Sequence, residues 1–459
     1  MFTINFKKPI HVYFIGIGGI SMSGLAQILL SRGFQVSGSD MKESALTRQL
    51  ASRGARLHYG QQLSHLDDTV ELVVYTAAIH EDNPEFQDAC TRRLPMLSRA
   101  ELLGQLMKNY ELPIAVSGTH GKTTTTSMIS EVLLASETDP TLTIGGILPS
   151  IGGNIRIGHS PYFVTEACEY TNSFLHFFPK ISIILNIEED HMDFFQNLEE
   201  IQHSFHQFAS LLPKEGTLII NGAIPNLSAI TEALSCKVLR YGFTPDCDYF
   251  ASEITCDASG HPCFTLNRKG RESLKVRLGV YGLHNVSNSL AVLALSDLLE
   301  LPTENTLKAL SSFKGTDRRF EYKGKLGGIT IMDDYAHHPT EIRATLEAAR
   351  TLSPKRIWCI FQPHTYTRTK AFLTEFAQAL SLADFVVLTD IYAARETNTL
   401  GISSLDLKRE IEKLGKSCFY FPTFDEVENF LLQNSINGDL LITMGAGDIV
   451  KVGENLLGI

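Results

Sequence analysis

The sequence lacks the features that mark several large classes of protein. No apolar run is long enough to cross a bilayer, so we expect no membrane partner. Basic residues are outnumbered, with 40 Lys and Arg against 51 Asp and Glu and a net charge of −11. This balance argues against a nucleic-acid partner, because binding to phosphate backbones depends on clustered positive charge. Low-complexity segments and short-period repeats are also missing, which favours ordinary globular domains.

Cysteine pairs of the CxxC type are absent as well. The eight cysteines show neither the spacing nor the histidine partners of a zinc site. We therefore expect reduced thiols, which predicts a cytoplasmic protein. With 459 residues the chain is too long for a single core, so two to four domains are expected.

The alternation of apolar and helical segments predicts an α/β fold with parallel, doubly wound sheets. The expected strands are residues 12–15, 34–38, 72–75, 163–166, 182–186, 217–221, 330–332, 357–361, 385–389 and 440–444. Between them, residues 246–278 show short strand-like pieces with turns, which indicates an antiparallel insert. Glycines and charges gather over residues 315–328, which predicts a linker.

The most informative motif is Gly118-Thr119-His120-Gly121-Lys122-Thr123-Thr124, between an expected strand and an expected helix. Glycines allow backbone N–H groups to converge on phosphate oxygens, and the helix N-terminus adds partial positive charge. Lys122 supplies a full charge, and Thr123 offers a hydroxyl to Mg²⁺. The motif is a shortened P-loop, because Val116 stands where the full pattern has glycine. It predicts a site for a nucleotide triphosphate.

A second glycine loop, Gly16-Ile17-Gly18-Gly19-Ile20-Ser21, follows the first expected strand. Asp40 ends the next strand, where an acidic group would meet a ribose. The loop fits a NAD- or FAD-dependent enzyme, a UDP-sugar site, or a tight turn without ligand. The motif alone does not choose among these.

Carboxylates follow two strands of the second unit. Glu166 ends one strand, and Asn186-Ile187-Glu188-Glu189-Asp190-His191 follows another. Both stretches lie at the carboxyl edge of the expected sheet, where carboxylates would bind Mg²⁺. On its own, His191 fits a hydrogen-bonded loop histidine better than a metal ligand.

Three further motifs each have a functional and a structural interpretation. Asn285 and Asn288 could contact adenine or cap a helix. Arg318-Arg319 could bind phosphate or form a solvated basic pair. Arg368 could hold a carboxylate through two hydrogen bonds or face water. The acidic and histidine-rich run from Asp333 to Thr340 is too dense for a zinc site.

Taken in order along the chain, these motifs resemble the Mur ligases. The resemblance implies three domains: residues 1–111, Rossmann-like, for a UDP-sugar; residues 112–317 for ATP; and residues 318–459, also Rossmann-like, for an amino acid. It implies ATP-dependent ligation of L-alanine to UDP-N-acetylmuramate through an acyl phosphate, in peptidoglycan precursor synthesis, by a monomer or homodimer. A related ligase for another amino acid or peptide, an oxidoreductase and a non-catalytic nucleotide-binding module are the alternatives.

The resemblance also implies roles for single residues. Its implied UDP-sugar residues are Gly16, Gly18, Gly19, Ser21, Ser23, Ser39 and Asp40. Its implied ATP residues are Gly118, Thr119, His120, Gly121, Lys122, Thr123, Thr124, Asn285, Asn288, Arg319 and Asp334. Its implied Mg²⁺ ligands are Thr123, Glu166 and His191, and its amino-acid residues are His338, His364 and Arg368. The implied catalytic set is Lys122, Glu166, His191, Arg319, Asp334 and His338, with His338 as the base for the amine.

The sequence departs from the family pattern at two positions near the expected amino-acid site. Thr365 stands where many members carry arginine, and Ala336 where glycine is frequent. Arg368 alone is therefore expected to hold the amino-acid carboxylate. No lysine matches the carbamoylated lysine that some relatives use at the metal site.

Overall fold

The computed structural model describes residues 2–60, 62, 65–76, 78–394 and 396–459. It divides into two compact units, and each unit is assembled from two stretches of chain. Unit 1 comprises Met1–Glu188 with Leu198–Leu239, and unit 2 comprises Glu189–Asn197 with Arg240–Ile459. The predicted domain boundaries after residues 111 and 317 fall inside these units and stay predictions. No described helix is both long and apolar enough to cross a membrane.

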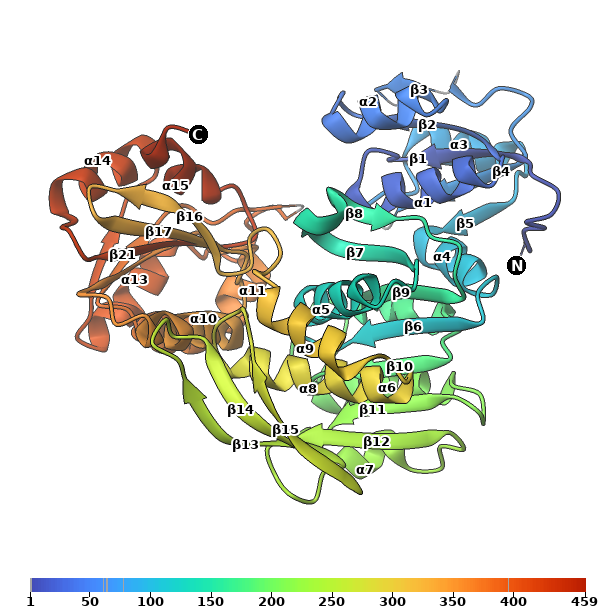
Figure 1. The fold of residues 1–459 in the computed structure, drawn as a ribbon. Coiled ribbons are helices and arrows are strands. Elements are labelled where there is room, and N and C mark those ends of the chain that lie inside the picture. The colour runs from blue at the N-terminus through green and yellow to red at the C-terminus, as the bar shows by residue number, and fades with distance from the viewer. Residues whose placement is uncertain (1, 61, 63–64, 77, 395) are drawn as a thin grey trace. The chain divides into compact units, whose positions relative to one another are not determined.

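Unit 1 begins with a parallel sheet in the order β3-β2-β1-β4-β5 (Figure 1). Its elements are β1 (His11–Ile15), α1 (Ile20–Ser31), β2 (Gln35–Asp40), α2 (Ala45–Ser52), β3 (Arg56–Tyr59), β4 (Leu72–Tyr75), α3 (Pro84–Thr91), β5 (Met96–Ser98) and α4 (Arg99–Met107). Every residue of β1 is buried, as expected for a central parallel strand covered on both faces. The strand order reverses beside β1, and ligands of such sheets bind at the carboxyl ends near that point. The first glycine loop lies there, between β1 and α1.

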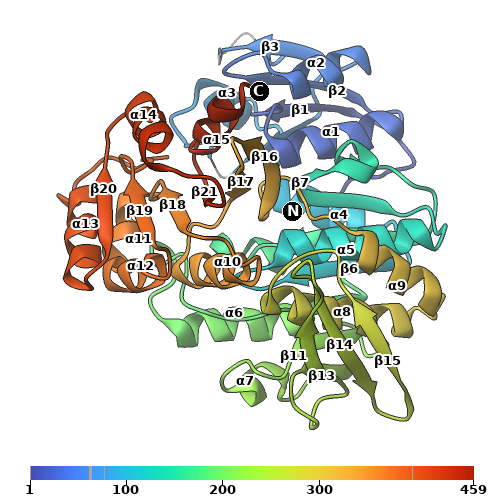
Figure 2. The ribbon, with the colours of Figure 1, turned by 60° about the vertical axis from the view of Figure 1, so that its left-hand side comes forward.

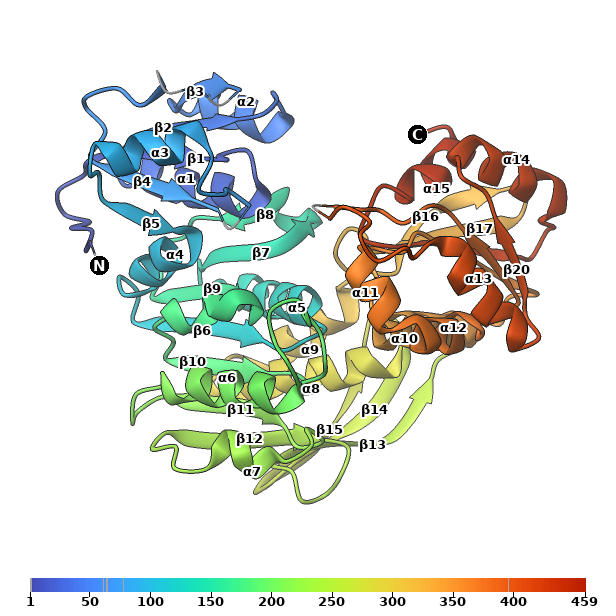
Figure 3. The same ribbon diagram turned by 180° about the vertical axis from the view of Figure 1, so that it is seen from behind.

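Unit 1 also contains part of a second sheet, whose strands from β12 onward run in the order β12-β11-β10-β6-β9-β7-β8. Its elements are β6 (Leu112–Ser117), α5 (Lys122–Ala135), β7 (Thr141–Leu148), η2 (Pro149–Ile151), β8 (Gly153–Arg156), β9 (Tyr162–Ala167), η3 (Tyr170–His176), β10 (Ile181–Ile184), α6 (Leu198–Ser210), β11 (Thr217–Asn221), α7 (Leu227–Thr231) and β12 (Lys237–Gly242). From β6 the chain moves one way through α5, and from β10 it moves the other way through α6. Right-handed crossovers therefore place α5 and α6 on opposite faces (Figures 1 and 3).

Unit 2 starts with the predicted antiparallel insert, which is confirmed. It consists of β13 (Tyr249–Cys256), β14 (Pro262–Arg268) and β15 (Arg271–Arg277), and both neighbouring pairs are antiparallel. Two helices follow, α8 (Leu283–Leu298) and α9 (Thr303–Ser312), and α8 packs on β13 and β14. The insert covers the buried side of α8.

The third sheet, in unit 2, has the order β16-β17-β21-β18-β19-β20. Its elements are β16 (Glu321–Leu326), β17 (Ile329–Asp334), α10 (Pro339–Thr351), β18 (Ile357–Phe361), α11 (Tyr366–Ala371), α12 (Leu373–Leu380), β19 (Phe385–Leu388), α13 (Ser404–Lys413), β20 (Ser417–Tyr420), α14 (Phe424–Asn434), β21 (Leu440–Met444) and α15 (Val450–Leu457). Helices α10, α12 and α13 cover one face, and α14 and α15 cover the other (Figure 2). Three sheets flanked by helices confirm the predicted α/β class.

The predicted linker over residues 315–328 is wrong in its second half. Strand β16 pairs antiparallel with β17, and the turn between them is Gly327-Gly328. Both glycines have positive φ, 55° and 83°, which side chains disfavour. The composition that suggested a linker is therefore that of a β-hairpin.

The core of unit 2 contains the chain's one tryptophan. Trp358, on β18, is 2% exposed and stacks on Phe385 with ring centroids 4.3 Å apart. Its indole Nε1 donates a hydrogen bond to Oδ2 of Asp439 at 3.0 Å, so its polar atom is satisfied although buried.

Candidate functional site

The phosphate loop of unit 1 follows β6, in the interior of the sheet, and leads into α5. Gly118 has φ of 143° and Gly121 has φ of 83°, both in the range that favours glycine. A Cβ at Gly118 would lie 3.0 Å from Leu185 Cβ, so only glycine lets the loop lie against the end of β10. The loop geometry is therefore specified by the two glycines of the motif.

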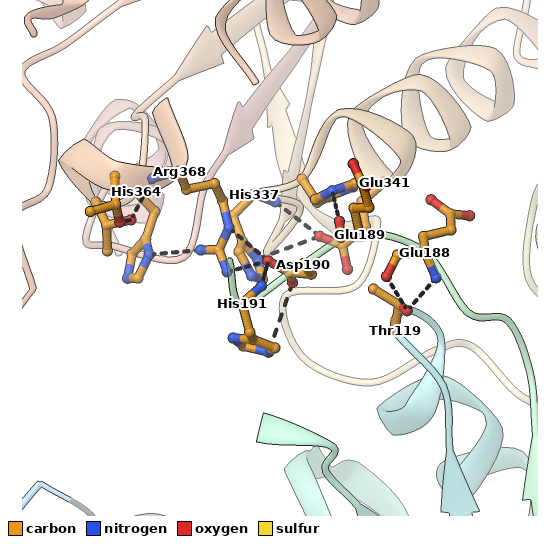
Figure 4. Close-up of polar contacts among 12 residues, drawn as sticks. Thr119, Glu188, Glu189, Asp190, His191, His337, Glu341, His364 and Arg368 are labelled. Carbon is orange, nitrogen blue, oxygen red and sulfur yellow. Dashed lines mark hydrogen bonds and ion pairs between the residues drawn. The ribbon is translucent and has the colours of Figure 1, made fainter. Parts of the chain in front are cut away.

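Asn186 holds the loop in place from the end of β10. Its Oδ1 accepts a hydrogen bond from the His120 backbone N–H at 2.7 Å, and its Nδ2 donates to the His120 carbonyl at 3.0 Å. The Thr119 hydroxyl accepts from the Glu188 backbone N–H at 2.9 Å (Figure 4). Sequence reasoning placed Asn186 in a metal-binding stretch, whereas the structure shows that it supports the loop.

Lys122 forms an ion pair with Glu169. Its Nζ lies 3.1 Å from Glu169 Oε2 and donates to the backbone carbonyls of Gly118 and Thr119. Burial alone would lower the pKa of Lys122, but the adjacent carboxylate of Glu169 outweighs it and raises the pKa above its usual value. Lys122 is therefore charged at every working pH. Glu169 was missed as its partner, although it stands three residues after the predicted Glu166.

Glu166 and Thr123 supply oxygen donors of the type that Mg²⁺ prefers. Thr123 is the second residue of α5, and Glu166 is near the end of β9, the neighbour of β6. Glu166 Oε1 accepts a hydrogen bond from the Gly145 backbone N–H at 2.6 Å. A Cβ at Gly145 would lie 2.7 Å from each carboxylate oxygen, so the absence of a side chain there leaves room for Glu166. These residues fit Mg²⁺.

Asp40 stabilises the first glycine loop through a hydrogen bond. Gly16 has φ of 82°, and the Gly18 backbone N–H donates to Asp40 Oδ2 at 2.8 Å. Ser23 and Ser39 are fully buried; Ser23 Oγ bonds the Ile20 carbonyl, and Ser39 Oγ bonds buried Glu85. Both serines therefore support the loop from inside, and their predicted contact with a UDP-sugar is not supported.

In unit 2, Asp334 orders the connection that carries the two arginines. Its carboxylate is 7% exposed and accepts hydrogen bonds from Ala336 N at 2.7 Å, Phe320 N at 3.0 Å and Thr345 Oγ1 at 2.9 Å. Burial raises the pKa of Asp334 to about 6, against the opposing effect of Arg319. In this structure Asp334 therefore fixes the backbone at Phe320 and Ala336 through hydrogen bonds.

The two arginines of the predicted phosphate clamp have different environments. Arg318 donates to Asp333 Oδ2 at 3.0 Å and to the carbonyls of Gly445 and Gly447 at 2.8 and 3.0 Å. It anchors the glycine turn after β21. Arg319 Cζ lies 5.2 Å from the Tyr335 ring centroid. Of the two, Arg319 is the one whose guanidinium is not committed to the backbone, which agrees with its predicted role.

Asn285 and Asn288 bond within unit 2. Asn288 Nδ2 donates to Asn285 Oδ1 at 3.0 Å, and Asn285 Nδ2 donates to the Tyr281 carbonyl at 2.8 Å. The exposed fractions of Asn285 and Asn288 are 7% and 6%. The structural interpretation, stabilisation of the start of α8, fits these contacts better than the predicted contact with adenine.

The predicted amino-acid residues surround an ion pair that the sequence did not reveal. Arg368 donates from Nε and Nη2 to Oδ1 of Asp190 at 3.2 and 2.8 Å, and its Nη1 lies 3.3 Å from His364 Nδ1 (Figure 4). Arg368 offsets the effect of burial and holds the pKa of Asp190 well below its usual range. His191 has φ of 54°, and its backbone N–H donates to the same oxygen, Asp190 Oδ1, at 2.8 Å.

His338 is the N-cap of α10. Its Nδ1 accepts from the Thr340 N–H at 3.3 Å, and its Nε2 lies 3.1 Å from the Glu189 carbonyl. Only a ring protonated at Nε2 satisfies both contacts. Neither nitrogen then offers a lone pair to an amine, so the geometry does not support His338 as the predicted base.

Comparison with known proteins covers all three sheets. Residues 11–111 match the model described as Mur ligase family, catalytic domain; residues 116–296 match the Mur ligase middle domain; and residues 318–447 match the Mur ligase, glutamate ligase domain. The chain belongs to the Mur ligase family. The resemblance inferred from the motifs is confirmed.

Individual Mur ligases resemble the chain over its full length. The UDP-N-acetylmuramate--L-alanine ligases of Agathobacter rectalis and Lachnospira eligens are 58% and 57% identical, with 100% of both chains covered in each case. The crystal structure of UDP-N-acetylmuramate-alanine ligase from Thermotoga maritima superimposes with a TM-score of 0.82 at 29% identity, covering 98% of each chain. A murein peptide ligase from Psychrobacter arcticus gives 0.72 at 26% identity over 98% of each chain.

The predicted Mg²⁺ ligands of this Mur ligase are distributed over the two units. Thr123 and Glu166 belong to unit 1, and His191 belongs to unit 2 through the segment Glu189–Asn197. The site therefore stays a prediction as a whole, supported in unit 1 by the two oxygen donors.

Proposed function

We propose that this Mur ligase joins L-alanine to UDP-N-acetylmuramate and converts ATP to ADP and phosphate. The observation that carries the proposal is the full-length identity of 58% and 57% to two proteins named for that reaction. The phosphate loop and the charged Lys122 supply the chemistry that such a ligase needs.

The reaction needs an activated carboxylate, because a free carboxylate is a poor electrophile. An oxygen of the muramate carboxylate attacks the γ-phosphorus of ATP, and the bond to the bridging oxygen breaks, so ADP leaves. The alanine amine then attacks the acyl phosphate, and phosphate leaves from the tetrahedral intermediate as the amide forms. The amine must lose protons on the way, to water or to a group other than His338.

Charge neutralisation is the main task of unit 1. Two anions meet in the first step, and Lys122 at the start of α5 is fixed toward the loop by Gly118, Thr119 and Glu169. Bound Mg²⁺ would be held by Thr123 and Glu166 and would stabilise charge on the phosphate oxygens. In unit 2, Arg368 would receive the alanine carboxylate through donors that Asp190 and His364 orient.

The test is phosphate release by the full-length protein with ATP, Mg²⁺ and UDP-N-acetylmuramate, against a panel of acceptors. We expect release with L-alanine above that with glycine, L-serine or the tripeptide L-alanyl-γ-D-glutamyl-meso-diaminopimelate, after which a structurally similar ligase is named. Release that depends on the tripeptide and not on alanine would favour the related ligase class. If none of the acceptors increases phosphate release, the proposal is wrong.

Reduced cysteines and a cytoplasmic location fit this function, and all eight cysteines are free thiols.

A further inference from the structure

A cavity of about 130 Å³ in unit 1 contains an arginine that none of the motifs includes. Helix α1 packs on strands β7 and β8 and on helix α4 here (Figure 1). The lining of the cavity includes Ser21 of α1 and Arg99 of α4, and also Glu166 of β9 and Cys168 just after it. It therefore extends from the start of α1, after the first glycine loop, to the candidate Mg²⁺ ligand of the second sheet.

Arg99 is held in this position by the start of its own helix. It is the first residue of α4, after the N-cap Ser98, whose side chain accepts from the Glu101 N–H at 3.2 Å while Glu101 bonds back to the Ser98 N–H at 2.7 Å. This reciprocal capping box sets the direction in which residue 99 leaves the helix. The capping box thus fixes the backbone from which the Arg99 side chain extends to the cavity.

The positive charge of the Arg99 guanidinium is only partly balanced by neighbouring groups. Its Nη1 donates to Ser21 Oγ at 3.1 Å, and no carboxylate among the described residues forms an ion pair with it. Burial lowers the pKa of Arg99, and the nearby Cys168 and Glu166 only partly oppose that effect. A guanidinium has five N–H donors, so most of its hydrogen-bonding capacity faces the cavity. Such a group binds an anion well.

The place of the cavity distinguishes between the anionic groups of the substrate. Gly16, Gly18 and Gly19, which the family resemblance assigns to the UDP-sugar, do not line it, and the Gly18 N–H is bonded to Asp40. Glu166 does, and the carboxylate that attacks ATP must lie near the Mg²⁺ ligands. A volume of this size holds a few waters or a small acid group, but no nucleotide.

We propose that Arg99 binds the carboxylate of the muramate lactyl group and orients it for attack on ATP. This inference rests on the proposed function. A hydrogen bond from the guanidinium to one carboxylate oxygen leaves the other oxygen to form the bond to phosphorus. Glu166 lines the same cavity, so the positive charge of Arg99 also reduces the repulsion between Glu166 and the substrate carboxylate.

The experiment compares two ligands in calorimetric titrations without ATP. UDP-N-acetylmuramate carries the lactyl carboxylate, and UDP-N-acetylglucosamine has the same nucleotide and amino sugar without it. For Arg99→Gln we expect binding of the first to weaken about 10- to 100-fold, as for the loss of a charge-assisted hydrogen bond, and binding of the second to change less than about 2-fold. Arg99→Lys should recover part of the preference. Arg53→Gln, at an exposed arginine of the same unit, is the matched control.

Equal weakening for both ligands would overturn the inference, because Arg99 would then serve the diphosphate or the fold. Unchanged binding of UDP-N-acetylmuramate would also overturn it. If Arg99→Gln fails to fold, the comparison is made on Arg99→Lys, in which a preference for UDP-N-acetylmuramate equal to that of the wild type would overturn the proposed hydrogen bond from the guanidinium. Wild-type phosphate release with alanine is measured in parallel. Its absence would overturn the proposed function, whereas its presence with unaltered discrimination in the variants overturns only the role of Arg99.

Discussion

Asp190 holds Arg368 through one carboxylate oxygen, which accepts from Nε at 3.2 Å and from Nη2 at 2.8 Å. The two side chains are 8% and 11% exposed. An internal carboxylate thus fixes the guanidinium that the proposed function assigns to the carboxylate of alanine. The pair leaves Nη1, which faces His364, as the nitrogen that is not bonded to Asp190.

Replacing Asp190 with Asn should raise the KM for alanine about 10-fold and leave kcat and the KM for ATP nearly unchanged, because Arg368 loses its orientation. Removing one partner of a largely buried ion pair should also lower the free energy of unfolding by roughly 3 kcal/mol. Steady-state kinetics and urea unfolding measure the two effects. Glu347→Gln, at an exposed carboxylate of α10, is the control. A lower KM for alanine would instead mean that Asp190 competes with the substrate.

Replacing Lys122 with Ala should reduce alanine-dependent phosphate release by about 10²- to 10³-fold, since a preorganised charge at the phosphate loop is lost. Glu169 would then be left without its ammonium partner. The double variant Lys122→Ala and Glu169→Gln removes that imbalance and should unfold at a higher temperature than the single variant, without regaining activity. Lys214→Ala, at an exposed lysine, should behave as wild type. Near-normal turnover in Lys122→Ala would refute the assignment of the loop.

Adding a methyl group at Gly145 should weaken the dependence on Mg²⁺ selectively. The new Cβ would lie 2.7 Å from both oxygens of Glu166 and must displace that carboxylate. We expect Gly145→Ala to raise the Mg²⁺ concentration for half-maximal activity about 10-fold, as for the loss of one well-placed interaction. Gly153→Ala is a close control, because a Cβ at Gly153, on neighbouring β8, meets nothing within 4 Å. Equal Mg²⁺ requirements in the two variants would contradict this role of Glu166.

The buried carboxylate of Asp334 should make unit 2 less stable as the pH rises. Burial raises its pKa from 3.8 to about 6, so the folded protein keeps a proton that the unfolded chain has released. The stabilisation is complete below about pH 4 and is lost as the pH passes about 6, a change of about 3 kcal/mol. In Asp334→Asn this slope should disappear from calorimetric unfolding curves. Asp425→Asn, at an exposed aspartate, should retain the slope. An unchanged slope in Asp334→Asn would show that other groups cause it.

The elements that form the fold could be predicted because their signals are local. The apolar run before the phosphate loop, the glycines at 118 and 121 and the helix after Lys122 are read from one short stretch. Parallel topology then places Glu166 at the same sheet edge, since β9 pairs with β6. The hairpin at Gly327-Gly328 was misjudged because turn glycines and linker glycines have the same composition.

Pairings between distant side chains could not be predicted in the same way. Asp190 and Arg368 are 178 residues apart, and sequence pattern does not tell which acceptor a guanidinium will find. Likewise Ser39 seemed available to a ligand because buried Glu85, its partner, lies 46 residues away. Asn285 and His338 carry side chains that serve equally as helix caps and as ligands, and only the geometry distinguishes the two uses.

The stacked indole in the core of unit 2 gives this chain a built-in optical reporter. Trp358 is the one tryptophan in the sequence. Fluorescence excited at wavelengths that only tryptophan absorbs therefore reports on the third sheet, in unit 2, and not on unit 1. Far-ultraviolet circular dichroism, in contrast, averages over both units. Unfolding curves from the two signals will coincide if the units unfold together and will separate if they do not. A single protein sample thus shows whether the two halves of the ligase are thermodynamically independent.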